Sequence, residues 1–103
     1  MAYSFIINDE AIQELTEAFL WYEEQQIDLG KEFRAKVYER LNQVCNNPLH
    51  NQISNKKFRE ALTDKFPFLI VYFIDERNHI IVVTAIFHTS RNPKSKFKRN
   101  RLT

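Results

Sequence analysis

Apolar residues at helical spacing predict two amphipathic helices in the first half of the chain. The first apolar stripe recurs every three or four residues and comprises Ile12, Leu15, Phe19 and Tyr22. Either Asn8 or Asp9 is expected to cap this helix, which ends near Gln26. The second stripe comprises Phe33, Val37, Leu41 and Val44. We expect Gly30 to form the turn between two antiparallel helices, and Asn46-Asn47-Pro48 to end the second one.

The rest of the chain has the pattern of β-strands. Strands are predicted over residues 3–7, 57–62, 68–74 and 79–87, with a polar loop over 48–56 and a turn at 75–78. The apolar run over 68–74 is typical of a central strand covered on both faces. The order is therefore βααβββ. It predicts an α+β fold in which a helical hairpin packs on one face of a four-stranded, mostly antiparallel sheet.

Length and composition agree with one packed domain. The chain has 103 residues, of which 44% are hydrophobic and 14% aromatic. The core is expected to contain Ile12, Leu15, Phe19, Phe33, Val37, Leu41, Ile70, Tyr72, Val82 and Val83. The single cysteine, Cys45, cannot form an internal disulfide, and the longest apolar run, Phe66–Ile74, is shorter than the roughly 20 residues that span a membrane. We expect a cytoplasmic protein without a membrane partner.

Charge is distributed unevenly along the chain. Residues 1–30 contain seven acidic side chains and no Lys or Arg, whereas the remaining residues carry 15 basic and 6 acidic side chains, a net charge of +9. From about residue 89 the tail is basic and contains Arg91, Lys94, Lys96, Lys98, Arg99 and Arg101. Such a segment suggests an acidic or polyanionic partner, although a solvated tail that only aids solubility explains the charge equally well.

Cofactor chemistry is poorly supported by the motifs. The spacing of histidines and cysteine matches no zinc site, and His79 and His88 would face opposite sides of an unbroken strand. One glycine cannot build a phosphate-binding loop. Cys45 lies beside an apolar stripe and is expected to be a small buried side chain rather than a nucleophile. We therefore expect no metal and no cofactor.

Basic residues flank two of the predicted strands. Lys56, Lys57 and Arg59 stand at the start of one strand, and His88 and Arg91 at the end of another. In an antiparallel sheet these ends can converge on a surface that holds RNA or an acidic peptide. His and Arg could also supply the base, acid and cation for RNA cleavage without a metal. The structural alternative is a strand-terminal histidine with solubilising lysines.

Several motifs together resemble one family. They are Trp21-Tyr22-Glu23-Glu24-Gln25, Leu29-Gly30 before Phe33, Asn47-Pro48, Phe58-Arg59-Glu60-Ala61, the strand Phe66–Tyr72, and Ala85-Ile86-Phe87-His88 with Arg91-Asn92-Pro93. In this order they resemble the RelE/ParE superfamily of toxins from bacterial toxin–antitoxin modules. The resemblance covers nearly the whole chain and implies a growth-inhibiting toxin that a cognate antitoxin neutralises. RelE-like members cleave mRNA on the ribosome, whereas ParE-like members poison DNA gyrase.

The departures from the nuclease pattern favour the ParE-like side. RelE-like nucleases have an arginine early in the central strand, where this chain has Leu69, and a tyrosine six residues after the late arginine, where it has Phe97. Neither replacement can perform the corresponding chemistry. We therefore expect inhibition by binding, with DNA gyrase as target and no catalytic residues. The alternatives are a metal-independent, ribosome-dependent mRNA endoribonuclease using Arg59, His88 and Arg91, and a non-toxic interaction module.

The residues expected to contact the target or the antitoxin are the basic ones near these strand ends and in the tail. They are Lys56, Lys57, Arg59, His88, Arg91, Lys94 and Lys96. The expected partners are a cognate antitoxin and either DNA gyrase or the ribosome with its mRNA. A homodimer and a toxin–antitoxin hetero-oligomer are both open as assemblies.

Overall fold

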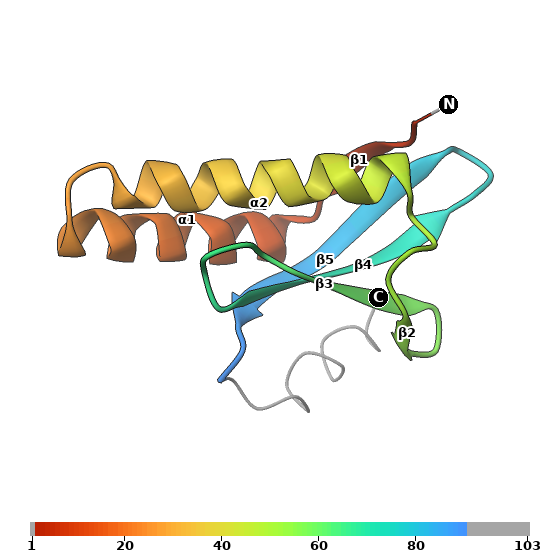
Figure 1. Ribbon diagram of the computed structural model, residues 1–103. Coiled ribbons are helices and arrows are strands. Elements are labelled where there is room, and N and C mark those ends of the chain that lie inside the picture. Colours follow the sequence, from red (N-terminus) through yellow and green to blue (C-terminus); the bar gives the residue numbers. More distant parts are fainter. Residues whose placement is uncertain (1, 91–103) are drawn as a thin grey trace.

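Two antiparallel helices cover one face of a five-stranded sheet in the computed structural model, which describes residues 2–90 (Figure 1). The helices are α1 (Asp9–Gln25) and α2 (Leu29–Asn46). The strands are β1 (Ser4–Ile7), β2 (Ile53–Asn55), β3 (Phe58–Leu62), β4 (Phe68–Asp75) and β5 (Ile80–His88). Their order across the sheet is β1-β5-β4-β3-β2. The α+β class and the helical hairpin on one face are therefore as predicted.

The sheet differs from the prediction in strand number and direction. The sheet has five strands instead of four. It is mixed because β1 runs parallel to β5 while all other neighbouring strands are antiparallel. The extra strand, β2, lies inside the segment predicted as a polar loop. It has three residues and pairs with β3 across a turn in which Lys56 has a positive φ of 53°. So short a strand is stabilised by its partner and carries no pattern of its own.

The turn between the helices is made by Asp28, not by Gly30. Asp28 has the left-handed φ of 70°, and Gly30 lies within the first turn of α2. A Cβ on Gly30 would lie 2.4 Å from the carbonyl oxygen of Phe19 and 2.6 Å from Cγ of Glu23. The Glu23 carboxylate also accepts a hydrogen bond from the backbone N–H of Lys31 at 3.0 Å. The glycine is therefore required by the close approach of the helices.

The inward face of α1 is rotated from the predicted stripe. Ala11 and Leu15 are buried against the sheet, whereas Ile12 is 46% exposed and Phe19 is half-buried. The small side chain of Ala11 lets the helix approach the sheet, and the larger residue that follows it points sideways. Ile12 was thus wrongly assigned to the core and Phe19 belongs to it only in part. The other eight predicted core residues, Leu15, Phe33, Val37, Leu41, Ile70, Tyr72, Val82 and Val83, are buried.

Four aromatic rings join the hairpin to the sheet. Tyr22 of α1 lies 5.2 Å from Phe33 of α2 and 5.0 Å from Phe66, measured between ring centroids. Phe33 lies 4.8 Å from Phe68, the first residue of β4. All the ring pairs within this cluster are tilted or edge-on, an arrangement that favours aromatic contacts beyond their buried area. The cluster connects both helices, the β3–β4 loop and the central strand.

A β-bulge at Thr84 changes which face the end of β5 presents. Tyr72 pairs with Val83 and Val71 pairs with Ala85, so Thr84 is the additional residue. After it, Ile86 packs into the core under the helices, while Ala85 joins an apolar cluster on the opposite face of the sheet. The prediction that His79 and His88 face opposite sides of the sheet assumed an unbroken strand. The bulge shows that this assumption is wrong.

The face of the sheet away from the helices has its own apolar cluster. Phe58, Val71, Ala85 and Phe87 are buried there, and Phe73 packs against them. Both faces of β4 are therefore covered, as its continuous apolar sequence predicts. Within residues 2–90 no helix is long and apolar enough to cross a membrane.

Replacement of Gly30 by alanine tests the close helix contact. The new Cβ would collide with the Phe19 carbonyl oxygen, which belongs to the backbone of α1 and cannot rotate away. We expect Gly30→Ala to lower the free energy of unfolding by about 1–3 kcal/mol, measured by urea denaturation. This loss would outweigh the gain of roughly 1 kcal/mol that alanine brings to a helix interior.

Lys31→Ala is the matched control, because Lys31 is exposed in the same helical turn. Its unfolding free energy should stay within about 0.5 kcal/mol of the parent value. A Gly30→Ala protein as stable as the parent would contradict the contact.

Candidate functional site

The basic residues of the β2–β3 hairpin are divided between the two faces of the sheet. Lys56 occupies the exposed turn. Lys57 extends over the aromatic side chains of the helix-free face, with its Nζ atom 4.1 Å from the ring centre of Phe73. Arg59 pairs in register with Tyr72, whose side chain faces the helices. The hairpin therefore presents two exposed lysines and one half-buried arginine.

The predicted convergence of this hairpin with His88 does not occur. Arg59 pairs with Tyr72 and His88 pairs with Phe68, so the two positions are four residues apart along β4 and two strands apart across the sheet. At about 3.3 Å per residue and 4.8 Å per strand, their Cα atoms are roughly 16 Å apart. The reason is topological, because β3 and β5 both run antiparallel to β4 and so start at the same end. Arg91, Lys94 and Lys96 lie outside the described residues.

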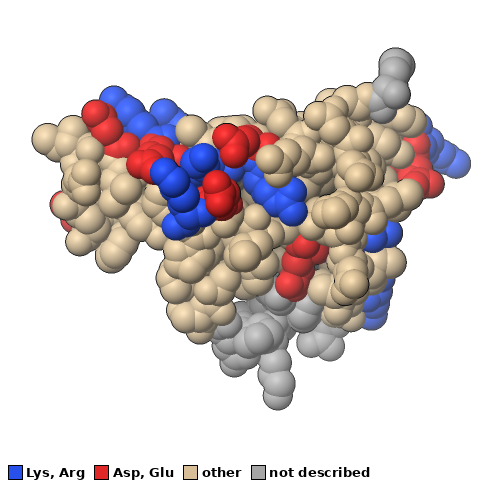
Figure 2. Space-filling view, viewed as in Figure 1, with Lys and Arg blue, Asp and Glu red and all other residues tan. Residues whose placement is uncertain are grey.

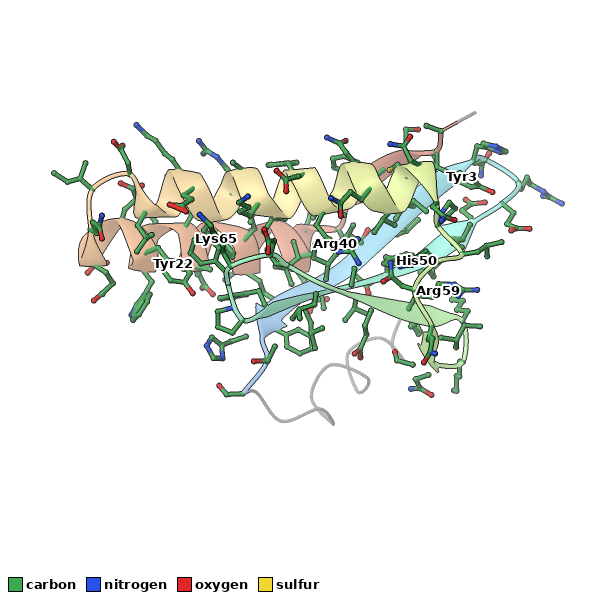
Figure 3. All side chains as sticks on the ribbon, viewed as in Figure 1. Tyr3, Tyr22, Arg40, His50, Arg59 and Lys65 are labelled. Carbon is green, nitrogen blue, oxygen red and sulfur yellow. The ribbon has the colours of Figure 1, made fainter. Side chains whose placement is uncertain are left out.

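Arg59 belongs to a polar network that fixes the segment after α2 (Figure 3). Its Nη1 donates a hydrogen bond to the carbonyl oxygen of Asn51. Asn51 donates through Nδ2 to the Tyr72 hydroxyl at 3.2 Å, and that hydroxyl donates to the Pro48 carbonyl oxygen at 3.0 Å. Arg40 of α2 donates to Oδ1 of Asn51 at 3.0 Å. The two arginines thus hold one loop, Arg40 from α2 and Arg59 from β3.

Sequence patterns did not identify Arg40 or Asn51 as members of this network. Arg40 also donates through Nε to the carbonyl oxygen of Leu62 at 3.0 Å, so it joins α2 to the end of β3. Burial raises the pKa of the Tyr72 hydroxyl, and the hydrogen bond from Asn51 and the charges of Arg59 and Arg40 offset part of that rise. The hydroxyl stays protonated and remains a donor at neutral pH.

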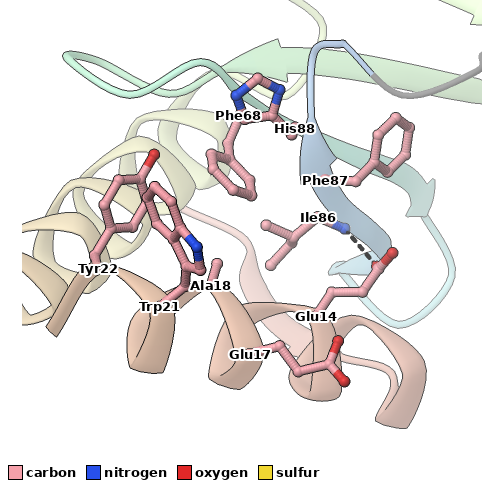
Figure 4. A pocket seen from close by; sticks show the side chains of 9 residues that line it. All are labelled: Glu14, Glu17, Ala18, Trp21, Tyr22, Phe68, Ile86, Phe87 and His88. Atoms are coloured by element: carbon pink, nitrogen blue, oxygen red, sulfur yellow. Dashed lines mark hydrogen bonds between the residues drawn. The ribbon is translucent and has the colours of Figure 1, made fainter. Parts of the chain in front are cut away.

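His88 lies in a separate pocket at the other end of the sheet (Figure 4). The pocket has a volume of about 450 Å³ and is lined by Glu14, Glu17, Ala18, Trp21, Tyr22, Phe68, Ile86, Phe87 and His88. The His88 ring stands edge-on to Phe68 with centroids 5.4 Å apart. Its Nδ1 accepts a hydrogen bond from the backbone N–H of Ser90 at 3.1 Å, so the ring proton of neutral His88 lies on Nε2.

Glu14 attaches α1 to the free edge of β5 beside this pocket. β1 ends at Ile7, opposite Val83, and leaves the following residues of β5 without a strand on that side. Glu14 Oε1 accepts a hydrogen bond from the backbone N–H of Ile86 at 2.9 Å. The pocket therefore has an acidic and aromatic wall rather than a basic one, which is opposite to the character expected for an RNA-binding surface.

The outer surface of α2 carries alternating charges that hold the β3–β4 loop (Figure 2). Lys36 forms ion pairs with Glu39 at 3.7 Å and Asp64 at 3.6 Å. Lys65 pairs with Glu32 at 3.3 Å. These pairs are mostly exposed and contribute little stability each, but they fill this face with both signs of charge. It is therefore not a continuous basic patch.

The described residues offer no metal site and no activated thiol. No group of three His, Cys, Asp or Glu side chains lies close enough to hold a metal ion within residues 2–90. Burial raises the pKa of the Cys45 thiol, which keeps it in the less nucleophilic protonated form. His79 stacks on Tyr3 with centroids 4.2 Å apart, and β5 separates it from His88. Among residues 2–90, Arg59 and the histidines do not come together as an acid–base–cation constellation.

Residues 5–93 match the family model described as the ParE toxin of the type II toxin–antitoxin system parDE. No curated protein matches the sequence. The chromosomal ParDE system of P. aeruginosa contains a chain of similar structure, with a TM-score of 0.74, 11% identity, and coverage of 86% of this chain and 98% of that one.

Two structures from E. coli share the fold as well. The isolated RelE toxin is similar with a TM-score of 0.67 and 15% identity over 99% of this chain and 100% of that one. The intact RelBE toxin–antitoxin complex contains a chain with a TM-score of 0.68 and 16% identity, covering 87% of this chain and 100% of that one. At such low identity these likenesses show a common fold.

Removal of the Tyr72 hydroxyl tests the polar network. In Tyr72→Phe the Pro48 carbonyl oxygen loses its donor and the Asn51 amide loses an acceptor. We expect the free energy of unfolding to fall by about 1–3 kcal/mol in urea denaturation. Tyr38→Phe is the control, since Tyr38 is exposed on α2 and its hydroxyl has no such role; it should change stability by less than about 0.5 kcal/mol.

Alkaline pH should destabilise the protein through its buried acids. Burial raises the folded-state pKa of Tyr72 and Tyr22 above the ordinary value of 10.0, and that of Cys45 above 9.0. The unfolded chain therefore loses these protons first, so their contribution to stability is complete below pH 9 and declines as pH rises through 9–10 and above. Urea titrations at pH 8 and 10.5 should show this decline, and Tyr72→Phe should reduce it. Equal stability at both pH values would contradict the burial of these groups.

Proposed function

Because this chain belongs to the ParE toxin family of type II toxin–antitoxin systems, we propose that it inhibits growth by binding DNA gyrase and that it has no nuclease activity. A cognate antitoxin neutralises it. The solved structures that share this fold include complexes of a toxin with its antitoxin, namely RelE with RelB and the ParDE system. The basic character of the chain beyond residue 30 favours an acidic antitoxin electrostatically.

The observation that carries the proposal is the separation of Arg59 from His88. Cleavage of RNA needs a general base or acid within about 3 Å of the proton that it moves, with a cation on the same phosphate. Cα atoms roughly 16 Å apart on the sheet place Arg59 and His88 unfavourably for joint action on one phosphodiester group. Arg59 is also engaged by the Asn51 carbonyl oxygen, so its role is to position the loop after α2.

The apolar face of the sheet gives independent support. β4 has no Lys or Arg, and Leu69 at its start pairs with Phe87. Val71 and Ala85 continue this apolar surface. A phosphate placed there would lose its hydration without gaining a charged partner, which is costly. Loss of a single group that stabilises the transition state commonly lowers the rate about a hundredfold or more.

The contact residues follow from exposure. Lys56 and Lys57 project from the β2–β3 hairpin, and His88 borders its pocket. We propose these residues, together with Arg91, Lys94 and Lys96 of the tail, as contacts to gyrase or antitoxin. Arg59 supports them by fixing the adjacent loop.

The target can be tested by inducing the protein in bacteria and examining plasmid topology and total mRNA from the same culture. Inhibition of gyrase predicts loss of negative supercoiling in the plasmid while mRNA stays intact. The purified protein should also inhibit gyrase-driven supercoiling of relaxed DNA. Removal of the basic hairpin charges in Lys56→Ala/Lys57→Ala should weaken that inhibition about tenfold, whereas Lys31→Ala on α2 should not.

Codon-positioned mRNA cuts that disappear in His88→Ala would overturn the binding mechanism and assign His88 a role as acid or base. Normal growth, normal supercoiling and intact mRNA at high expression would instead indicate a member of the family that only binds its partner.

A further inference from the structure

The His88 pocket combines an apolar interior with an acidic rim (Figure 4). Phe68 and Ile86, which are buried, and the half-buried Ala18 form its interior. Trp21 also lines it and is 56% exposed. The volume of about 450 Å³ is within the range of about 300–1,000 Å³ that is usual for clefts that hold small molecules. The pocket therefore has the size and the interior of a ligand site.

A small residue of α1 between two larger ones creates the space. Glu14, Ala18 and Tyr22 follow one another at intervals of four residues and so lie along one side of the helix. Glu14 reaches the Ile86 backbone N–H at 2.9 Å, and the Tyr22 ring lies 6.1 Å from the ring of Phe68, measured between centroids. The methyl group of Ala18 leaves the room between them unfilled. Contacts at both ends therefore hold the pocket open.

The lining of the pocket contains two carboxylates and no Lys or Arg. Glu14 is bonded to the backbone of β5, whereas Glu17 is exposed and accepts a long hydrogen bond of 3.4 Å from Gln13. Among residues 2–90 no Lys or Arg forms an ion pair with Glu17. A cation at the rim would gain a carboxylate partner there.

An aromatic ring completes the rim. Trp21 is four residues after Glu17 and therefore lies on the same side of α1. Tryptophan is the side chain that attracts cations most strongly through its ring face. Lys and Arg side chains lie over the rings of Phe19, Phe58 and Phe73, but none within the described part of the chain lies over Trp21. The rim thus presents an exposed ring and an exposed carboxylate to the same space.

We propose that this pocket binds a small organic cation in which one protonated amine is attached to an apolar or aromatic body. The body lies against Ala18, Phe68 and Ile86. The ammonium group lies at the rim, between the carboxylate of Glu17 and the ring of Trp21. The inference does not rest on the proposed gyrase target, because it concerns binding of a small molecule by the isolated protein.

Other occupants fit the pocket less well. An anion such as a nucleic-acid phosphate would meet two carboxylates and no basic side chain of the lining. A metal ion would find too few ligands, since no three His, Cys, Asp or Glu side chains of residues 2–90 lie together. A second copy that docked through the same face would bring two acidic helices together, because residues 1–30 contain seven acids and no base.

The fluorescence of Trp21 provides a direct test, because it is the only tryptophan in the sequence and it lines the pocket. Phenethylamine is the probe, and phenethyl alcohol is its neutral counterpart of nearly equal size. At neutral pH we expect phenethylamine to change the emission of Trp21 saturably, with half-saturation near or below about 1 mM. Phenethyl alcohol should bind at least about tenfold more weakly because it lacks the charge.

Two variants separate the rim from the interior. Glu17→Gln should weaken the binding of phenethylamine at least about threefold and leave that of phenethyl alcohol unchanged. Glu24→Gln is the matched control, because it removes an exposed carboxylate of α1 that does not line the pocket, and it should bind both probes as the parent does. Ala18→Leu fills the interior and should weaken both probes at least about tenfold. Circular dichroism verifies that each variant is folded, and the exposed position of Glu17 keeps the test valid if Ala18→Leu does not fold.

The proposal would be overturned if phenethylamine caused no saturable change, if the two probes bound equally, or if Glu17→Gln bound phenethylamine as the parent does. A dimer in sedimentation that phenethylamine dissociates would also overturn it, because the occupant would then be a second copy. The same holds if a full-length variant with Lys94, Lys96 and Lys98 changed to glutamine bound phenethylamine at least about tenfold more tightly, since the basic tail would then be the occupant.

Discussion

The packing of Tyr22, Phe33, Phe66 and Phe68 is the constraint on which the arrangement of helices and sheet depends. These rings come from four different segments and meet within a few ångströms. They fix the hairpin across the start of β4. The end of the hairpin that contains the α1–α2 turn extends past the sheet (Figure 1). Tyr22 and Phe68 then form part of the wall of the His88 pocket, so one cluster determines both the core and one functional surface.

The helices and long strands were predictable because their patterns are local. The stripe Phe33, Val37, Leu41 and Val44 faces the core as its spacing requires, and Asn47-Pro48 follows the end of α2. The first stripe failed at Ile12 because alanines carry little hydrophobic signal although they mark the closest contact. The parallel pairing of β1 with β5 joins residues more than seventy positions apart, and no local pattern encodes it.

The candidate site was harder to predict because it depends on strand direction. Lys56, Lys57 and His88 were identified by residue type, but their placement at opposite ends of the sheet follows from β3 and β5 lying on either side of β4. Arg40 and Asn51 have no motif around them. Asn51 matters because it donates a hydrogen bond to the buried hydroxyl of Tyr72, which lies 21 residues further along the chain. Only the folded structure brings these two side chains together.

The extra residue at Thr84 gives β5 a tolerance that a regular strand does not have. Without Thr84, Ala85 would still pair with Val71, and the residues that follow would keep their present faces. A gene could therefore lose this single codon and still encode a histidine beside Phe68. The same deletion in an unbulged strand would exchange the buried and outer sides of everything downstream. Loss of this one residue would therefore leave the downstream side chains on their present faces and remove only the local bend and twist of the bulge.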